Sequence, residues 1–599
     1  MSLVKHWRLV LLSLFAIVAL AAFAACGDDD DDEGDDGETP AATTPGGAPS
    51  GDERIDGGEL TIQGNEFQSL DPHFSSFAQD ISLHRMLWRG LYSLDMDNVP
   101  VPAMAASDPE VSADGMTYTI TLRDGLVWSD GDDLLAEDFV AGLLRTCNPV
   151  NAGEYQYVLT EVVGCDDFYN AAAGPDHEAG TADDLALDDA SLQPLQDAVG
   201  VTAIDDTTIE IKLSVPKPTF PIILSLWMTF PVPVHLPRFA AATPSAPGDW
   251  GTDPAALAYN GPYVMDSYTP QLEGVLSPNP NWSEEYSAVG KAPTLDKITV
   301  RYIDDLSQAA NAYRSGELDA TDVDLTQLET LVSEFGDGEE YFKFLAPSTR
   351  GVEMNLEHPP LDNLDVRLAL SRAIDRDALN QVVVQGGNEP STSWVPEVTG
   401  GHAPDEFNDI VGFDAAAAAQ HLADAGYPDG AGFPTLDILV GDSPSAQATA
   451  QFLQESFRTI LNIETTITVV DSPTRSSRFR EEQFDLFPGG WIQDYPDPEN
   501  WIVGLFDTPG TLNHYNCSDP EIDALVEEAK VNTNDTERRQ QYKDANEIIS
   551  TTMCGIATYW HENNHWLRKS NVIGISEYMT GQDGAMGGDW AAEAWGLSS

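Results

Sequence analysis

Basic residues are scarce in this sequence. Its 599 residues include 29 Lys and Arg against 99 Asp and Glu, which gives a formal net charge of -70 at pH 7. Such a balance repels the phosphates of nucleic acids, so we expect no nucleic-acid partner. Most of the acidic excess is spread along the chain, which is typical of a soluble exterior in salt and says little about fold. The length allows two or three compact units with a large core.

Long apolar runs are also missing, apart from one near the N-terminus. Residues 5–8 are mostly basic, and residues 9–22 form an apolar run that is too short for a comfortable membrane span. The pattern predicts a signal peptide over residues 1–25. The small residues before Cys26 resemble a bacterial lipobox, which implies a lipid on Cys26; an ordinary cleaved signal is the alternative. Residues 26–55 are acidic and rich in Thr, Pro, Gly and Ser, which predicts a disordered tether.

Only five cysteines are present, and no pair has the CxxC spacing of zinc or redox motifs. An exported chain meets oxidising conditions, and four cysteines are left when Cys26 is set aside, so disulfides are favoured. The sequence-local pairings are Cys147 with Cys165 and Cys517 with Cys554. Free thiols are the alternative.

Catalytic motifs are rare. The sequence has no G-x-S-x-G, Walker or Gly-rich dinucleotide motif, and we expect no enzyme and no cofactor. His561, Glu562 and His565 fit H-E-x-x-H, which on a helix binds zinc in metalloproteases; this is the remote alternative, and the strand-like residues before it disfavour a helix. The Gly- and Asp-rich loop 174–184 has oxygens for a calcium ion, but lacks the EF-hand order, so a plain acidic loop is preferred. We expect no metal.

One stretch near the C-terminal end carries the main candidate site. The apolar residues 484–487 predict a buried strand, and Gly489, Gly490 and Trp491 follow it. The glycines allow a close approach of another backbone, and the indole offers a wide apolar face. Asp494 then lies where prolines end regular structure, well placed to receive a cationic group. A surface turn with a solvated carboxylate is the alternative.

The rest of the chain predicts an α/β protein. Alternating residues over 117–123 and 295–301 predict strands, and a helix begins near Ala136. Residues 436–440, 446–461 and 463–470 then predict strand, helix and strand, leading into the stretch with Asp494. Such alternation favours a sheet whose strand ends carry the ligand residues.

Several segments together resemble a known family. Residues 117–140 follow T-x-x-L-R-x-G-x-x-W-S-D-G-x-x-x-x-A-x-D-F-V within a longer match, residues 313–319 follow Y-R-S-G-E-x-D, and residues 491–495 follow W-x-x-D-Y. This pattern is similar to family 5 extracellular solute-binding proteins, the oligopeptide- and dipeptide-binding components of ABC importers. The resemblance runs from about residue 60 to residue 575.

The resemblance implies a two-lobed periplasmic-binding-protein-like fold, of the class II or cluster C type, with an extra small domain inserted in the first lobe. We expect lobe I over 56–80, 198–345 and 560–599, the inserted domain II over 81–197, and lobe III over 346–559.

The resemblance also implies site residues. By motif match, Asp494 holds the α-ammonium group of a peptide, with Trp491, Gly490 and Gly489 beside it. In the oligopeptide-binding members, the positions that match Glu66, Phe67 and Gln68 lie along the bound peptide. The region that matches Tyr155 and Tyr157 often has a ligand-facing Tyr. The resemblance therefore implies that these five residues also contact the ligand. Pro488 replaces an Arg that meets the peptide carboxylate in oligopeptide-binding members; Arg478 and Arg480 are nearby.

The expected function is therefore a substrate-binding lipoprotein that captures peptides between hinged lobes and delivers them to the permease and ATPase subunits of an ABC importer. The same role with a nickel chelate, a sugar or another solute is the alternative, because the family binds all of these. We expect a monomer in the cell envelope, lipid-anchored at the outer face of the cytoplasmic membrane or in the periplasm.

Overall fold

The computed structural model describes residues 54–174, 184–251, 253–508, 510, 512–578, 586 and 588–598. Residues 51–599 form one compact unit. The expected signal peptide, Cys26, nearly all of the tether and all but the two end residues of loop 174–184 lie outside the described residues. No helix in the described part is long and apolar enough to cross a membrane.

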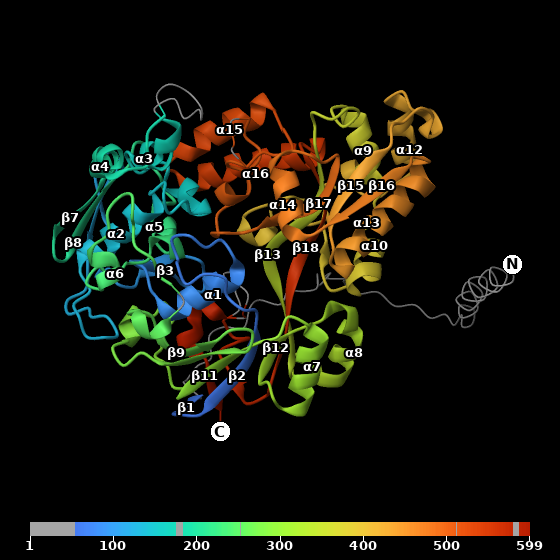
Figure 1. Cartoon of the computed structure of the whole chain (residues 1–599). Coiled ribbons are helices and arrows are strands. Elements are labelled where there is room, and N and C mark those ends of the chain that lie inside the picture. The colour runs from blue at the N-terminus through green and yellow to red at the C-terminus, as the bar shows by residue number, and fades with distance from the viewer. Residues whose placement is uncertain are drawn as a thin grey trace, which may run out of the picture. The chain divides into compact units, whose positions relative to one another are not determined.

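One large mixed sheet organises this unit (Figure 1). Its strands follow the order β16-β15-β17-β13-β18-β12-β2-β11-β10-β9, and β14 pairs with β18 beside this path. The strands are β2 Glu59–Gly64, β9 Tyr263–Thr269, β10 Glu273–Pro278, β11 Lys297–Tyr302, β12 Ala320–Asp322, β13 Tyr341–Met354, β14 Glu389–Pro390, β15 Leu436–Gly441, β16 Thr465–Val470, β17 Leu486–Ile492 and β18 Ile556–Arg568.

Two long strands connect the lobes. The first part of β13 pairs with the end of β18, next to β12 of lobe I, whereas its second part pairs with the start of β18 and with β17 of lobe III. The β13–β18 register shifts between Leu345 and Thr349. The expected lobe boundaries, 345/346 and 559/560, therefore fall inside β13 and β18. Two continuous strands with a break in register are suited to a hinge, because only a few residues have to change conformation.

Lobe III has the expected α/β order. Strands β15 and β16 are parallel, and β15 is also parallel to β17. Asp414 caps a helix by accepting hydrogen bonds from the amides of Ala416 and Ala417, as its position before an alanine run favours. The helices of this lobe are α9 Leu364–Arg372, α10 Arg376–Val384, α11 Asn408–Val411, α12 Ala415–Asp424, α13 Pro444–Ser456, α14 Ser472–Arg480, α15 Pro520–Val531 and α16 Asp535–Thr552.

The inserted domain is larger than expected. Its sheet has the order β5-β6-β8-β7, with β5 Glu110–Val111, β6 Thr117–Thr121, β7 Val201–Asp205 and β8 Thr208–Lys212. The expected end at residue 197 is therefore wrong, because β8 lies directly beside β6 and buries Ile209 and Ile211. The expected start at residue 81 falls inside helix α1 Ala78–Leu87, which is one continuous element.

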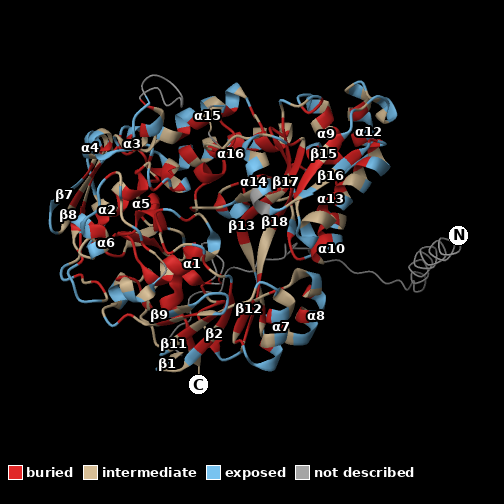
Figure 2. Ribbon diagram, in the orientation of Figure 1, coloured by how far each residue is buried: buried red, intermediate tan, exposed pale blue. Residues whose placement is uncertain are grey.

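The cores show which parts belong together (Figure 2). One cluster of buried side chains runs from Leu60 and Ile62 of lobe I to Ile209 and Ile211 of the inserted domain. Lobe III has two clusters of its own, one containing Ile438 and Leu486 and the other containing Trp501 and Ile556. Because close-packed cores resist deformation, lobe I and the inserted domain form one rigid body against lobe III.

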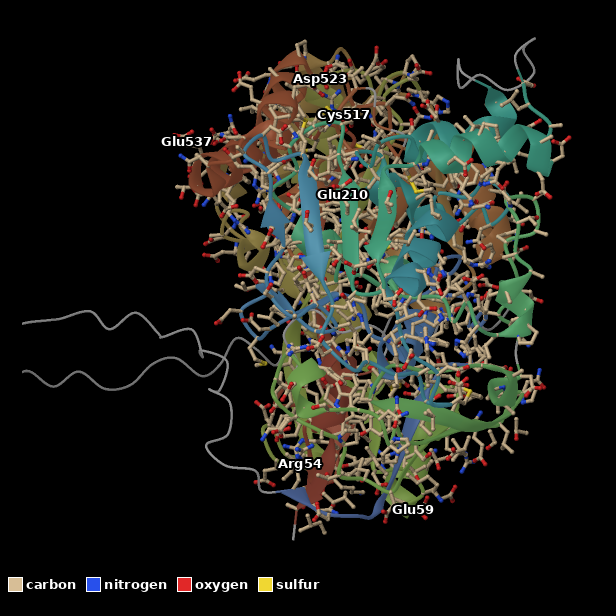
Figure 3. The ribbon with its side chains drawn as sticks, turned by 90° about the vertical axis from the view of Figure 1, so that its left-hand side faces the viewer. Arg54, Glu59, Glu210, Cys517, Asp523 and Glu537 are labelled. Carbon is tan, nitrogen blue, oxygen red and sulfur yellow. A yellow bond between two sulfur atoms is a disulfide. The ribbon has the colours of Figure 1, made fainter. Side chains whose placement is uncertain are left out.

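Both expected disulfides are confirmed. Cys147, which follows helix α2 Ala136–Thr146, is bonded to Cys165 at the start of helix α3 Cys165–Tyr169. Cys517 before α15 is bonded to Cys554 after α16, so this bond ties the ends of two packed helices (Figure 3). Both bonds lie within one lobe or domain and leave the connection between the lobes unconstrained.

Candidate functional site

The strand that leads to Asp494 requires glycine at two positions. Gly490 has φ +154°, and a Cβ there would lie 1.9 Å from the carbonyl oxygen of Thr349 on the paired strand β13. A Cβ on Gly489 would lie 2.7 Å from Oε2 of Glu353. These contacts exclude any side chain without movement of β13. The close approach predicted from the glycines is therefore confirmed, with β13 as the neighbouring backbone.

A cavity of about 430 Å³ lies in front of this strand and is lined by all three parts of the fold. Its volume is in the range of small-ligand sites. Asp494, Trp491 and Gly490 line it, as does Tyr155 of the inserted domain. Charged residues from α1, from the segment after it, from β13 and from β18 complete the wall: Arg85, Arg89, Arg350 and Glu562.

Asp494 is held by groups from two parts of the fold. Tyr155 donates to Oδ1 at 2.5 Å, and Tyr157 donates to Oδ2 at 2.7 Å. The side-chain amide of Asn500 donates to Oδ2 at 2.9 Å, and its carbonyl oxygen accepts from the Asp494 amide and from the Trp491 indole. Tyr155 and Tyr157 were expected near the ligand, and the structure brings both to Asp494.

Burial sets the electrostatics of this carboxylate. It raises the pKa of Asp494, and the hydrogen bonds from Tyr155, Asn500 and Tyr157 oppose the shift. Burial, followed by the nearby Asp494 charge, raises the pKa of each tyrosine well above its usual value. Both phenols therefore stay protonated and act as donors near neutral pH. A partly buried carboxylate that lines a cavity can receive a cation, because a cation offsets the cost of desolvation.

The cationic side chains of the cavity already have partners. Arg350 lies 3.0 Å from Glu562, which also accepts from Ser348, and Arg89 lies 3.0 Å from Glu593. These groups come from the strands β13 and β18, from the segment after α1 and from the C-terminal segment. Nothing in the local sequence pattern marked α1 as part of the site, because its lining residues become neighbours of Asp494 only through packing.

Three expected ligand residues lie elsewhere. Glu66 accepts from the Tyr268 hydroxyl at 2.5 Å and from the Gln271 amide at 3.0 Å, and Phe67 packs on the Tyr268 ring at 4.5 Å. The amide of Gln68 donates to Asp80 at 2.8 Å. None of the three lines the cavity with Asp494. The segment after β2 turns toward the strand pair β9–β10, and this removes it from the site.

The H-E-x-x-H residues do not form a zinc site. They lie on strand β18, where His561 and His565 have side chains on the opposite face from Glu562. His561 is bonded to the Ser393 carbonyl oxygen at 2.9 Å, and His565 is bonded to the Tyr341 hydroxyl at 2.8 Å and the Gly387 carbonyl at 3.1 Å. Burial lowers the pKa of both imidazoles to about 4. The metalloprotease alternative is wrong on this geometry.

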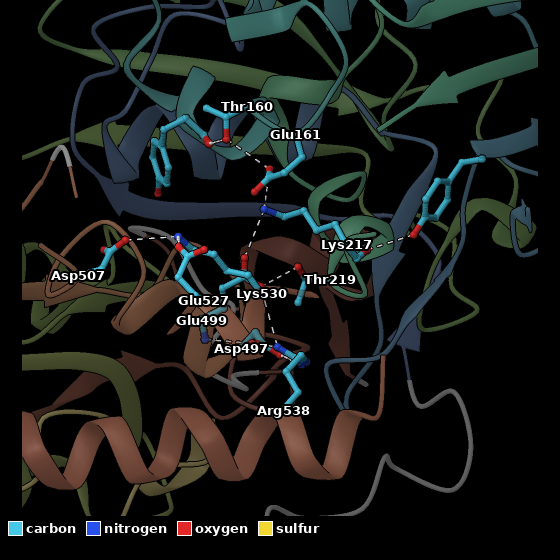
Figure 4. A network of polar contacts seen from close by, with 12 residues as sticks. Thr160, Glu161, Lys217, Thr219, Asp497, Glu499, Asp507, Glu527, Lys530 and Arg538 are labelled. Atoms are coloured by element: carbon cyan, nitrogen blue, oxygen red, sulfur yellow. Dashed lines mark hydrogen bonds and ion pairs between the residues drawn. The ribbon is translucent and has the colours of Figure 1, made fainter. Parts of the chain in front are cut away.

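A buried ionic network joins the inserted domain to the loop after Asp494 (Figure 4). Lys217 lies 2.8 Å from Glu161 of its own domain and 3.3 Å from Glu499 of lobe III. Thr219 donates to Glu499 at 2.8 Å. Burial lowers the pKa of Lys217, but Glu499 and Glu161 outweigh this effect and the net shift is upward. On the side of lobe III, Arg538 binds both oxygens of Asp497. The lysine therefore stays charged and links the two bodies.

Comparisons with known proteins place these observations in context. A family model described as bacterial extracellular solute-binding proteins, family 5 (middle region), matches residues 99–513. The oligopeptide-binding protein OppA of Bacillus subtilis strain 168 is 25% identical over 520 residues, which cover 86% of this chain and 89% of OppA. The probable deoxycholate-binding periplasmic protein YgiS of Escherichia coli K12 is 28% identical over 486 residues, covering 79% and 82%.

The fold also matches a solved structure. The murein tripeptide binding protein MppA of Escherichia coli superposes with a TM-score of 0.73 at 23% identity, over 91% of this chain and 100% of MppA. At this identity the likeness shows the fold alone, and it agrees with the two-lobed solute-binding fold.

The Lys217 network leads to a prediction about closure. Replacing Lys217 with Met leaves the buried Glu499 with only the more distant Arg538, at 3.9 Å, and removes the partner of the partly exposed Glu161. Breaking a fully buried pair costs about 3–5 kcal/mol, which is the upper bound here. We expect the Lys217→Met variant to have a larger radius of gyration by small-angle scattering, because lobe III separates from the inserted domain. Lys212→Met removes an exposed pair with Glu210 and should leave the radius unchanged. Equal radii for both variants would contradict a linking role for Lys217.

Proposed function

Because this chain belongs to the bacterial extracellular solute-binding proteins of family 5, we propose that it captures peptides between its lobes for uptake by an ABC importer. The observation that carries this proposal is the partly buried Asp494 carboxylate, which lines a cavity and is held by Tyr155 and Tyr157 from the opposite body. Relatives named for oligopeptide binding support the choice of ligand.

The backbone around the cavity favours an extended peptide. Strand β17 is paired with β13 over residues 486–492, but its other edge is paired with β15 only at Leu486. Among the described strands, none covers that edge at Gly490 and Trp491. Peptides commonly bind by adding a strand to such an edge, where backbone hydrogen bonds give affinity with little sequence preference. The α-ammonium group would then pair with Asp494, and Trp491 would pack on the first residues.

A non-peptide ligand is the second candidate, since one relative is named for probable deoxycholate binding. The importer role would be the same with this ligand, a nickel chelate, a sugar or another solute. A ligand without an ammonium group could donate a neutral hydrogen bond to Asp494 but could not form a charged pair that N-acetylation removes. Experiments on that carboxylate therefore separate the two candidates.

The first prediction concerns the Asp494–ammonium pair. Removing one partner of a desolvated charged pair costs on the order of 2–5 kcal/mol. We expect Asp494→Asn to weaken the binding of a free tripeptide by about thirtyfold or more, at about 1.4 kcal/mol per decade. N-acetylation of the peptide should cost a similar factor with the unaltered protein and little more with the variant, because both changes remove one interaction. Calorimetry of the four combinations measures this.

The control is Glu137→Gln, which neutralises an exposed carboxylate on α2 away from the cavity and should leave affinity unchanged. Additive losses in the four-way cycle, or equal affinity for acetylated and free peptides, would mean that the ligand has no ammonium group at Asp494.

The second prediction concerns pH. Burial raises the pKa of Asp494, and a bound ammonium group favours the ionised form. Below that raised pKa the free protein must lose a proton to bind, so affinity should fall as pH falls through it. At higher pH, affinity should stay constant until the peptide α-ammonium deprotonates near about pH 8. Calorimetry across pH measures the loss of affinity at low pH and at high pH. In Asp494→Asn the loss at low pH should be absent. A loss of the same size in this variant would mean that a group other than Asp494 titrates.

We also infer a position in the cell envelope, with the folded part delivering its ligand to permease and ATPase subunits as a monomer. The lipobox-like sequence before Cys26 and the polar segment after it support a lipid anchor at the outer face of the membrane. A single lipid anchor at Cys26, followed by a polar segment, would let the protein both capture and deliver its ligand.

The third prediction tests the anchor. Cys26→Ser removes the thiol that would carry the lipid, and the variant should leave the membrane fraction of a host that processes lipoproteins. Fractionation followed by immunoblotting measures this. Cys517→Ser is a poor control because it breaks a disulfide, so Ser50→Ala in the same N-terminal segment serves instead. Membrane association equal to that of the unaltered protein would contradict anchoring at Cys26.

A further inference from the structure

A second cavity, of about 370 Å³, adjoins the one that contains Asp494. The two cavities share four lining residues, Ser76, Tyr155, Gly490 and Trp491. Tyr157, which donates to Asp494, also lines the second cavity. Its volume holds a side chain together with ordered water. Apolar residues make up much of its wall: Trp394, Phe479, Phe487, Leu505, Leu512 and Tyr515.

Two buried polar atoms in this second cavity lack partners. Glu353 is 4% exposed and Tyr515 is 2% exposed, and both line the cavity. Oε2 of Glu353 and the hydroxyl of Tyr515 have no hydrogen-bond partner among the described residues. A buried polar atom without a partner costs free energy, and such atoms in a cavity are the usual contacts of a ligand.

The guanidinium group of Arg475 is a third polar group that lines the second cavity. Arg475, on helix α14 beside β17, lies 3.9 Å from the centre of the Phe487 ring and donates to the Pro488 carbonyl oxygen at 2.8 Å (Figure 1). No carboxylate of the described residues lies within ion-pair distance of Arg475. Its remaining N–H groups can therefore bind a ligand anion, because a guanidinium has five donors.

When Glu353 is protonated, the polar groups of the second cavity are hydrogen-bond donors. Burial raises the pKa of Glu353 to about 8, against the opposing charges of Arg475 and Arg350. Burial likewise raises the pKa of Tyr515 well above its usual value. Near neutral pH the second cavity thus presents a carboxyl O–H, a phenol O–H and a guanidinium. All three are complementary to the oxygens of a carboxylate.

We propose that the second cavity accepts the carboxylate of an acidic side chain, Asp or Glu, on the first residue of a bound peptide. This inference rests on the proposed function, because Asp494 must first hold the α-ammonium group. The first side chain is attached to the same carbon atom as that ammonium. The shared wall of Tyr155, Gly490 and Trp491 places the second cavity beside Asp494, so this side chain is the part of the ligand nearest to it.

The test uses the three tripeptides Glu-Ala-Ala, Gln-Ala-Ala and Lys-Ala-Ala, with binding measured by calorimetry at pH 7. We expect Glu-Ala-Ala to bind about tenfold tighter than Gln-Ala-Ala, as charged hydrogen bonds give such a factor. Amidating the C-terminus of both peptides should leave this ratio unchanged. A ratio that disappears on amidation would assign the carboxylate to the peptide terminus and overturn the proposal.

Variants of the second cavity test which residues bind the side-chain carboxylate of the peptide. Arg475→Gln should bring the Glu and Gln peptides to within about threefold of each other, because a charged donor is removed from one ligand only. Tyr515→Phe should reduce the ratio by a smaller factor without leaving a hole. Arg478→Gln is the matched control, since Arg478 is on the same helix and lines neither cavity, and its ratio should equal that of the unaltered protein.

The outcomes separate this proposal from the proposed function. Equal affinity for Glu-Ala-Ala and Gln-Ala-Ala, with N-acetylation still weakening both, would overturn the second cavity as a carboxylate site and leave peptide binding intact. Tighter binding of Lys-Ala-Ala would also overturn it and assign Glu353 to a cation. Failure of all three peptides to bind would overturn both.

Discussion

The contact between Asp494 and the two tyrosines is the interaction on which the site depends. Burying a carboxylate is costly unless its oxygens are hydrogen-bonded. Here the donors come from Tyr155 and Tyr157 of the inserted domain and from Asn500 of lobe III. The carboxylate proposed to bind a ligand cation is therefore also a contact between the inserted domain and lobe III. A ligand cation at Asp494 would act directly on this contact.

The rest of the fold is arranged so that this contact can form and break. Lobe I and the inserted domain share one core, lobe III has separate cores, and β13 and β18 connect them. Arg350 and Glu562 lie on these same connecting strands and line the cavity. Ligand groups near them would contact the hinge directly. The connecting strands and the Asp494 carboxylate would thus link ligand binding to closure.

The scarcity of basic residues has a structural counterpart. Several of the arginines and lysines lie inside the protein and pair with carboxylates there, including Arg89 with Glu593, Arg538 with Asp497 and Lys217 with Glu499. The acidic excess is thereby concentrated at the surface, where water and salt screen it. Arg475 is a partly buried cation, and no carboxylate of the described residues lies at ion-pair distance from it, which is unusual beside these paired cations.

Local chemistry was readable from the sequence, whereas contacts across the fold were not. The alternating strands, the helix capped by Asp414 and the family motifs depend on neighbouring residues, and the structure has them as predicted. The strand expected over residues 484–487 instead runs over Leu486–Ile492 as β17 and includes the Gly-Gly-Trp segment that was expected to follow it, because its pairing with β13 continues past Pro488. The tyrosines were expected near a ligand only through resemblance, and their bonds to Asp494 span 339 and 337 positions. The packing of β8 on β6, the turn that removes Glu66 to Gln68, and the approach of Arg475 to Glu353 had no local signal. Such contacts depend on how separate elements pack against each other, so only the tertiary structure decided them.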